Sequence, residues 1–353
     1  MTSYALYRMP HSKQATLVAQ LTGEPEQLSS CRELSGRQGF VMAPFAVGSD
    51  EPLLLIRPDV VETSENLDGL LRAIPEFAPR KLPVCSEETH GTRASYGADF
   101  RRFHERLMAG DFRKIVLSRC DVQPRGSDDE QPIELFRKAC ARYPRLFVAL
   151  VFTPQSGLWL TATPEVLLNS NGEQWHTIAL AGTMRLEGAD LQGEGQHVRW
   201  STKNIEEQRL VATYIKERLQ SFAAGISEEG PRTVRAANLV HLRSDFTFFV
   251  KDEVREGDLI AALHPTPAVC GLPKQETFQF IVDNEHTPRR YYSGFMGPLN
   301  MPTALFVSLR CMQITDDAYR LYAGGGLLRD SQEEQEWMET EAKMQTMREL
   351  MGG

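Results

Sequence analysis

Apolar residues recur at two spacings along the chain, and each spacing predicts a different kind of element. Compact apolar runs predict strands at 114–120 (KIVLSRC), 146–152 (LFVALVF) and 158–163 (LWLTAT). Apolar residues at helical spacing predict a helix over 100–107, ended by Gly110, and a long helix over 200–222. Residues 303–325 predict a hairpin, and a glycine-dense turn at 324–326 leads into a final helix.

The order of these elements bears on the fold class. The strands mostly follow one another through short turns, without strict alternation of strand and helix. Such an order favours an α+β fold of layered antiparallel sheets over a doubly wound parallel sheet. The sequence contains no internal repeat and no low-complexity linker. We therefore expect one domain over 1–353, with a variable, strand-rich N-terminal part (1–93) and a core (94–350).

Composition narrows the class of protein. The 353 residues are 41% hydrophobic and 24% charged, and the net charge is -8 without a Lys/Arg tract. A nucleic-acid partner, which needs a basic face, is not expected. No apolar run reaches the roughly 18 residues of a membrane span, and the N-terminus lacks the apolar core of a signal peptide. Six scattered cysteines (31, 85, 120, 140, 270 and 311) without a CxxC pair favour reduced thiols in a cytoplasm.

The final helix has two different faces. Glu336, Glu339 and Lys343 are spaced i, i+3 and i+7, so they share one face with Met347 and Leu350. Carboxylates are seldom buried unless they are paired or metal-bound. This face therefore predicts a hard cation and an anionic substrate beside the glycines, although a solvated charged face is the alternative. The opposite face is expected to lie in water and carries Glu341, Gln345, Arg348 and Glu349.

Three other charged residues break the pattern of the element that carries them. Glu207 falls in the apolar stripe of the 200–222 helix, either as a metal ligand facing Glu336 or as a buried carboxylate tied to an arginine. Lys114 begins a strand, where it is either an edge charge in water or a buried base whose pKa desolvation lowers. Glu165 follows an apolar strand, where it is either exposed or a general acid whose pKa burial raises.

Hydroxyl, guanidinium and imidazole groups supply further candidates. Gly182 and Thr183 follow an apolar strand and offer a backbone donor and a hydroxyl donor. Arg310 alternates into an apolar strand, so it is either paired structurally or offered to a carboxylate ligand. His241 and His264 lack the paired spacing of metal ligands, so each is expected to contact substrate or to pack in the core.

Nine segments, in this order along the chain, resemble the chorismate-utilising enzymes, and most closely the isochorismate synthases among them. The segments are KIVLSR, TATPEVLL, LAGT, KNIEEQRLV, LVHLRS, LHPTPAVCGLPK, RRYYSG, VSLR and YAGGGL with EQEWMETEAK. One such motif is weak, whereas nine in order across 94–350 are highly specific. The resemblance implies a single chorismate-binding domain with stacked antiparallel sheets flanked by helices. It also implies the Mg²⁺-dependent isomerisation of chorismate to isochorismate.

The resemblance also assigns roles to residues. Lys114 matches the base that activates water for addition at C2, and Glu165 matches the acid that protonates the departing C4 hydroxyl. The family's magnesium ligands match Glu207 and Glu336, with Glu339 close by. Tyr292 and Arg310, with the backbone at 324–326, match groups that hold the enolpyruvyl carboxylate. All the residues that match substrate contacts are Gly182, Thr183, His241, Thr266, Tyr292, Arg310, Gly324, Gly326 and Lys343.

Residues at three positions help to distinguish between the activities found among these relatives. Amine-using relatives typically lack the lysine at position 114, and aminodeoxychorismate synthases place a lysine where this chain has Ala181. Water is therefore the expected nucleophile, and no glutaminase partner is expected. A salicylate synthase, which also eliminates pyruvate, is one alternative. A non-catalytic chorismate-binding homologue is another, because Asn204 replaces a frequent acidic residue near the metal. We expect a monomer that serves menaquinone or siderophore biosynthesis, with menaquinone favoured.

Overall fold

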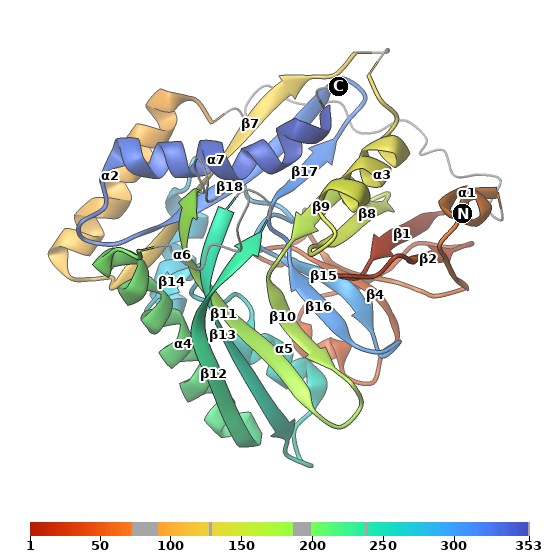
Figure 1. Cartoon of the computed structure of the whole chain (residues 1–353), viewed down its shortest axis with the longest axis horizontal. Coiled ribbons are helices and arrows are strands. Elements are labelled where there is room, and N and C mark those ends of the chain that lie inside the picture. Colours follow the sequence, from red (N-terminus) through yellow and green to blue (C-terminus); the bar gives the residue numbers. More distant parts are fainter. Residues whose placement is uncertain (73–90, 127–128, 186–198, 237–238, 352–353) are drawn as a thin grey trace.

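The fold consists of two large antiparallel sheets that lie face to face, with helices on their outer surfaces (Figure 1). The structure is a computed structural model, and it describes residues 1–72, 91–126, 129–185, 199–236 and 239–351. The two sheets confirm the α+β class of layered antiparallel sheets that the sequence predicts. No helix among these residues is both long enough and apolar enough to cross a membrane.

The first sheet, sheet 1, carries the strands that the sequence predicts most clearly. The predicted strands at 114–120, 146–152 and 158–163 correspond to β7, β8 and β9. Neighbouring strands of sheet 1 are antiparallel throughout. Their order is β14 (Gly271–Leu272), β7 (Lys114–Pro124), β18 (Ala318–Leu327), β17 (Cys311–Ile314), β9 (Gly157–Thr163), β8 (Phe147–Thr153), β1 (Ser3–Arg8), β2 (Ala15–Gln20) and β6 (Val60–Ser64).

The second sheet, sheet 2, contains three long strands at one edge and shorter strands at the other. Its neighbouring strands are also antiparallel. Their order is β12 (Ala223–Ala236), β13 (Leu239–Val250), β11 (Trp175–Arg185), β10 (Val166–Ser170), β16 (Ala304–Val307), β15 (Phe295–Leu299), β4 (Gly39–Ala43), β5 (Leu53–Ile56) and β3 (Glu26–Leu28).

The helices begin and end where local sequence signals place them. Gly110 ends α2 in the left-handed conformation with φ 85°, which glycine adopts without strain. The Ser201 side chain caps α4 by accepting the N–H of Asn204. The helices are α1 (Leu67–Arg72), α2 (Arg93–Ala109), α3 (Pro132–Arg142), α4 (Thr202–Phe222), α5 (Glu256–Leu263), α6 (Lys274–Asn284) and α7 (Glu333–Met351), with a short 3-10 helix at Cys31–Leu34.

Apolar side chains fill the space between the sheets and beneath the helices. Between the sheets, the rings of Phe147 on β8 and Phe306 on β16 stack with centroids 4.1 Å apart. On the outer face of sheet 1, α3 and α7 cover a second apolar cluster. On the outer face of sheet 2, α4 and α5 cover a third cluster. The layers are therefore helix, sheet, sheet and helix, as Figure 1 shows for α7 and α4.

The segment 303–325 does not form the single hairpin that its sequence predicts. Only β17 and β18 pair as a hairpin, because β16 belongs to sheet 2 and the chain crosses to sheet 1 at 308–310. Arg310 lies in this crossing with φ 47°, so it does not alternate along a strand as predicted. The three glycines at 324–326 are also not in a turn. They belong to β18 and pair with β7.

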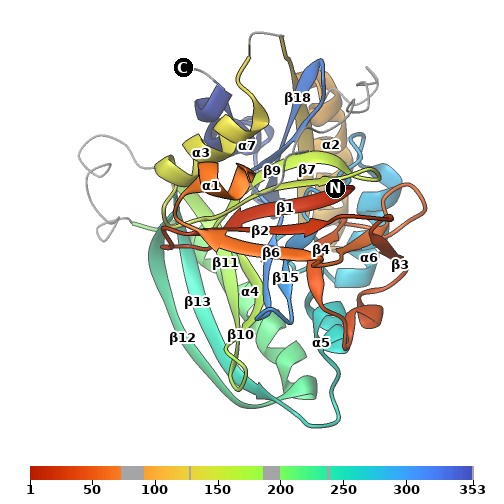
Figure 2. The same ribbon diagram turned by 90° about the vertical axis from the view of Figure 1, so that its right-hand side faces the viewer.

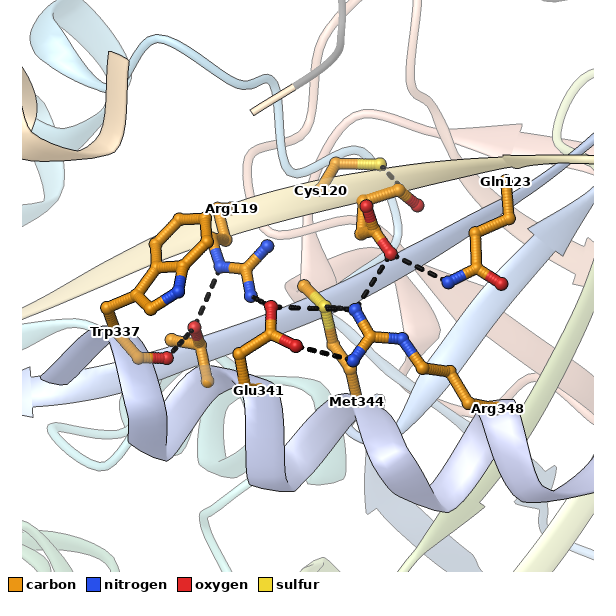
Figure 3. A network of polar contacts seen from close by, with 9 residues as sticks. Arg119, Cys120, Gln123, Trp337, Glu341, Met344 and Arg348 are labelled. Atoms are coloured by element: carbon orange, nitrogen blue, oxygen red, sulfur yellow. Dashed lines mark hydrogen bonds and ion pairs between the residues drawn. The ribbon is translucent and has the colours of Figure 1, made fainter. Parts of the chain in front are cut away.

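The predicted wet face of α7 is wrong for two of its residues. Figure 3 shows Glu341 between Arg119 of β7 and Arg348 of its own helix, and Arg348 also donates to Asp121 at 2.8 Å. The Arg119 guanidinium lies 3.7 Å from the centroid of the Trp337 ring. These contacts hold α7 over β7. The prediction failed because helical spacing alone does not reveal that charged residues of β7 face this side of the helix.

The N-terminal strands are built into both sheets. In sheet 1, β1 pairs with β8, and in sheet 2, β4 pairs with β15. Figure 2 shows β1, β2 and β6 side by side on the face of the molecule turned toward the viewer. The division at residue 93 stays a prediction, and Cys85 lies outside the described residues. The other cysteines are free thiols, as predicted.

Candidate active site

A pocket of about 610 Å³, its opening to solvent included, collects most of the residues singled out from the sequence. Apolar walls with a few converging polar groups are typical of a site for a small organic ligand. The predicted residues that line the pocket are Glu165, Gly182, Thr183, Glu207, His241, Tyr292, Arg310, Gly324, Gly326 and Lys343. The remaining four, Lys114, Thr266, Glu336 and Glu339, lie behind this wall and are described with their contacts below.

Two crossings between the sheets place the main polar groups of the pocket. The chain leaves sheet 1 after β9 and enters sheet 2 at β10, and Glu165 lies in that crossing. Arg310 lies in the reverse crossing, from β16 to β17. The two crossings adjoin each other, because Val307 N donates to Glu165 O at 2.9 Å. Side chains at such breaks are free of strand alternation and can point into the space between the sheets.

Glu165 is a buried acid whose environment favours its protonated form. Glu165 is 3% exposed, and burial raises the pKa of its carboxyl to about 7. The positive charges of Lys114 and Lys343 oppose this rise without cancelling it. Thr266 Oγ1 lies 3.5 Å from Glu165 Oε1, a long hydrogen bond. The sequence alternative of an exposed turn glutamate is therefore wrong.

Arg310 is held by a histidine and keeps one donor free. Arg310 Nη2 donates to His241 Nε2 at 2.8 Å, and His241 Nδ1 donates to Gly182 O at 3.1 Å. Burial, with the Arg310 charge, lowers the pKa of His241 well below 6.5, so the imidazole is neutral and can accept from arginine. Arg310 Nη1 is buried without a hydrogen-bond partner among the described residues. A ligand carboxylate would satisfy it.

Each predicted metal glutamate is paired with a lysine. Lys114 Nζ lies 3.0 Å from Glu207 Oε1, and Glu207 Oε2 accepts the N–H of Gly182 at 3.2 Å. Lys343 Nζ lies 2.7 Å from Glu339 Oε1. The carboxylate of Glu336 contacts Lys203. The charged partner of Glu207 is thus the ammonium of Lys114, and the arginine pairing considered for Glu207 is wrong.

Lys114 is buried, which excludes the exposed edge charge among its alternatives. Lys114 is 0% exposed, although it begins β7. The reason is that β14 covers this end of the strand, where Leu272 pairs with Lys114. Its ammonium is near Glu207 at ion-pair distance, but the angle leaves Nζ without a hydrogen bond. The Cβ of an alanine at Gly326 would lie 2.9 Å from Lys114 Cε, so this side chain reaches the pocket wall.

The donor set fits a hard divalent cation. Glu336 Oε2 is buried without a partner among the described residues, and burial with the charge of Glu339 raises the pKa of Glu336. A bound cation would give Glu336 Oε2 a partner and would favour the ionised form of the carboxyl. In the described ranges, no three acidic, imidazole or thiol groups converge closely enough to enclose an ion. Magnesium suits such an open site, because it usually keeps waters and takes few protein ligands.

Sequence reasoning missed several residues of the site. Lys203 lies four positions before Glu207, on the same face of α4, and that spacing could have revealed it. Most of the apolar pocket wall was also missed, because its residues look like ordinary core; the missed residues include Val116, Leu180, Ala268 and Val269. Of the two histidines, His264 packs in the core against Phe295, and its Nε2 lies 3.3 Å from Pro44 O.

Comparisons with known proteins identify the class. A family model described as "Chorismate binding enzyme" matches residues 39–352, so the chain belongs to the chorismate-binding enzyme family. The match begins well before residue 94, where the recognisable motifs begin.

Individual relatives carry more specific names. Isochorismate synthase EntC of Escherichia coli (strain K12) is 29% identical over 68% of this chain and 62% of that protein. Isochorismate synthase MenF of the same strain is 34% identical over 55% of this chain and 45% of that protein. The match therefore spans less than two thirds of the length of either relative. The crystal structure of DhbC from Bacillus anthracis is similar over 99% of this chain and 96% of that one, with a TM-score of 0.81 and 25% identity.

Proposed function

We propose that the protein is an isochorismate synthase, which converts chorismate into isochorismate by adding water at C2 with loss of the C4 hydroxyl. One observation carries the proposal: a buried acid with a pKa of about 7, Glu165, lines the pocket, and a fully buried lysine, Lys114, lies against its wall at Gly326. Addition and elimination need a base and an acid of this kind. The relatives named isochorismate synthase support the same activity.

The residues around the pocket support a role for each chemical step. In its neutral amine form, Lys114 takes a proton from the attacking water, and Glu207 holds the ammonium that results. Glu165 gives its proton to the departing C4 oxygen. Arg310, oriented by His241, binds a carboxylate of chorismate through its free Nη1. Lys343, which contacts Gly324 O at 2.8 Å, adds positive charge at the glycine strand.

We infer further that Glu207, Glu336 and Glu339 hold Mg²⁺. When bound, the ion neutralises the ring carboxylate and draws electron density toward it. Asn204, which departs from the frequent acidic residue, packs its Cβ 3.2 Å from the Cβ position of Gly182. It thus lies against Gly182, whose N–H donates to Glu207.

Replacing Lys203 by methionine is expected to tighten Mg²⁺ binding about tenfold, because the ion no longer competes with an ammonium for the Glu336 carboxylate. Isothermal titration of Mg²⁺ into the substrate-free protein at pH 8 measures this directly. Lys216→Met, on the exposed side of the same helix, is the control and should leave the affinity unchanged. Weaker binding in Lys203→Met would mean that this lysine organises the carboxylates instead.

Replacing Gly326 by alanine is expected to lower kcat/KM for chorismate about 100-fold, because a shift near 1 Å at a reacting group costs that much. The added Cβ would collide with the Glu207 carboxylate and press on Lys114. Steady-state kinetics measures the loss. Gly48→Ala, whose Cβ meets nothing within 4 Å, should retain full activity. Equal activity of both variants would show that the glycine strand does not set the geometry of the pair.

Water is the nucleophile that the site favours. Ala181 lines the pocket where a lysine would mark an aminodeoxychorismate synthase, and Lys114 is present. We propose no glutaminase partner on these grounds. We also propose a cytoplasmic monomer, with menaquinone synthesis the favoured pathway and siderophore synthesis the other.

The deciding experiment is product analysis after incubation with chorismate and Mg²⁺. Isochorismate as the released product is expected. Substantial salicylate and pyruvate would identify a salicylate synthase. Absence of turnover at saturating Mg²⁺, with chorismate still binding, would identify a non-catalytic homologue.

A further inference from the structure

A fully buried ion pair lies outside the pocket but against its walls. Arg289 and Glu285 have side chains that are 2% and 3% exposed, and Arg289 Nε lies 2.6 Å from Glu285 Oε2. A second bond, from Nη2 to Glu285 Oε1, measures 2.9 Å. The Arg289 guanidinium also lies 4.3 Å from the centroid of the Phe45 ring. Burying two charges is costly, so such a pair calls for an explanation other than stability.

The remaining bonds of the pair go to backbone of the pocket walls. Arg289 Nη1 donates to Val269 O at 2.6 Å, and Nη2 donates to Val116 O at 2.7 Å. Glu285 Oε1 accepts the N–H of Ser118 at 2.7 Å. Val116 and Val269 both line the pocket. The ion pair therefore joins strand β7 to the loop before β14.

The joined segments carry the groups assigned to binding and chemistry. On β7, Val116 and Ser118 are paired in register with Gly326 and Gly324 of the glycine strand. In the loop, Val269 N donates to the carbonyl of Thr266, whose hydroxyl reaches Glu165. The chain immediately after Arg289 leads to Tyr292, whose N–H donates to Arg289 O at 2.9 Å. The guanidinium of Arg289 thus contacts two sides of the pocket, and the backbone carbonyl of the same residue contacts a third at Tyr292.

We propose that Arg289 and Glu285 are positioning residues for the reaction, a latch that sets the distance between the glycine strand, the Thr266 loop and Tyr292. The proposal rests on the proposed function, since it concerns the same pocket. Arginine suits the task because its planar fork presents five donors in fixed directions, which lysine cannot replace. Neither residue touches the pocket itself, so neither is a catalytic residue.

The test separates positioning from simple stabilisation by removing one charge and then both. Arg289→Met or Glu285→Gln alone leaves a buried charge unpaired, so the melting temperature should fall by several degrees. The double variant Glu285→Gln/Arg289→Met contains no unpaired charge, so much of that fall should be recovered. Its kcat/KM for chorismate should nevertheless stay about 100-fold low, because the two carbonyls still lack their donor.

Two further variants serve as controls for misfolding and for unspecific loss of activity. Arg289→Lys keeps the charge but not the fork, so it should fold normally and lose about tenfold in kcat/KM. Arg8→Met is the matched control, because Arg8 is also buried and donates to the backbone of Tyr143 and Leu146, at 2.7 and 2.9 Å, without lining the pocket. It should lose stability and keep full kcat/KM at 25 °C.

The readouts also separate this proposal from the function itself. The descending limb of the pH profile should move to higher pH in the double variant, because the Thr266 hydroxyl no longer steadies the ionised form of Glu165. A recovered melting temperature with unchanged kcat/KM and pH profile would overturn the latch, as would an equal activity loss in Arg8→Met.

If the unaltered protein forms no isochorismate, the proposed function fails. Chorismate affinity in the same variants then decides the latch: a loss confined to the Arg289 variants supports it, and unchanged affinity overturns it.

Discussion

Replacing Lys114 by methionine is expected to abolish water addition while chorismate still binds. The methionine side chain has a similar length and no base, so turnover should fall by about 10²- to 10⁴-fold, the usual contribution of a general base. Binding should persist because Arg310 and Lys343, which supply positive charge to the substrate, are unchanged. Single-turnover kinetics measures the first effect, and calorimetric titration of chorismate measures the second.

A second variant separates proton transfer from charge pairing at this position. Lys114→Arg keeps a cation beside the Glu207 carboxylate, but a guanidinium does not lose its proton in proteins. If Lys114 acted only as a counter-ion, this variant would be active. We expect it to be as inactive as Lys114→Met, provided that its thermal unfolding shows that the larger head is accommodated. Near-normal turnover in either variant would remove the assignment of the base.

Much of the fold could be predicted because the clearest segments are buried on both faces. In β8 and β9 every residue but one is buried, so continuous apolar runs mark them plainly. The helix α4 could be recognised from its apolar stripe, and Glu207 drew attention because it interrupts that stripe. A charged residue placed at an apolar position is a signal that the sequence itself contains.

Other parts of the site could not be predicted from local patterns. Arg310 reads as a strand residue because its neighbours in sequence are apolar, yet its φ of 47° belongs to a crossing between sheets. The glycines at 324–326 resemble a turn, whereas the structure uses them to leave room for Tyr292 and Glu207 beside β18. The pairing of Arg119 with Glu341 depends on how α7 lies over sheet 1, which spacing along one helix cannot reveal.

The pocket places fixed cations around one acid whose pKa burial raises to about 7. Arg310, Lys343 and Lys114 all act on Glu165, and burial still raises its pKa. A dianionic substrate would neutralise part of this positive charge when it binds. Its negative charge would then raise the pKa of Glu165 further, so that the acid retains its proton until the C4 oxygen needs it.

Replacing Glu165 by glutamine is expected to lower kcat by about 10²- to 10⁴-fold, because no proton remains for the leaving hydroxyl. In the unaltered enzyme, a general acid with a pKa of about 7 requires kcat/KM to fall as pH rises above 7. The fall in kcat should begin at higher pH, since substrate raises the pKa. His241 and His264 do not produce this limb, because burial holds the pKa of both well below 6.5.

Stability provides an independent check on the same residue, with the opposite sign to activity. The folded pKa of about 7 exceeds the ordinary 4.5, so the stability that the protonated Glu165 contributes is complete below pH 4.5 and is lost as pH rises through 7. At pH 8 the unaltered protein buries a carboxylate, whereas Glu165→Gln buries a neutral amide. The variant should therefore be more stable there, by up to about 3 kcal/mol, and the gain should vanish near pH 4.5. Urea unfolding at the two pH values measures the difference. A variant that is equally inactive but shows no gain at pH 8 would mean that folding does not raise the pKa of Glu165, and the acid would have to be sought elsewhere in the pocket.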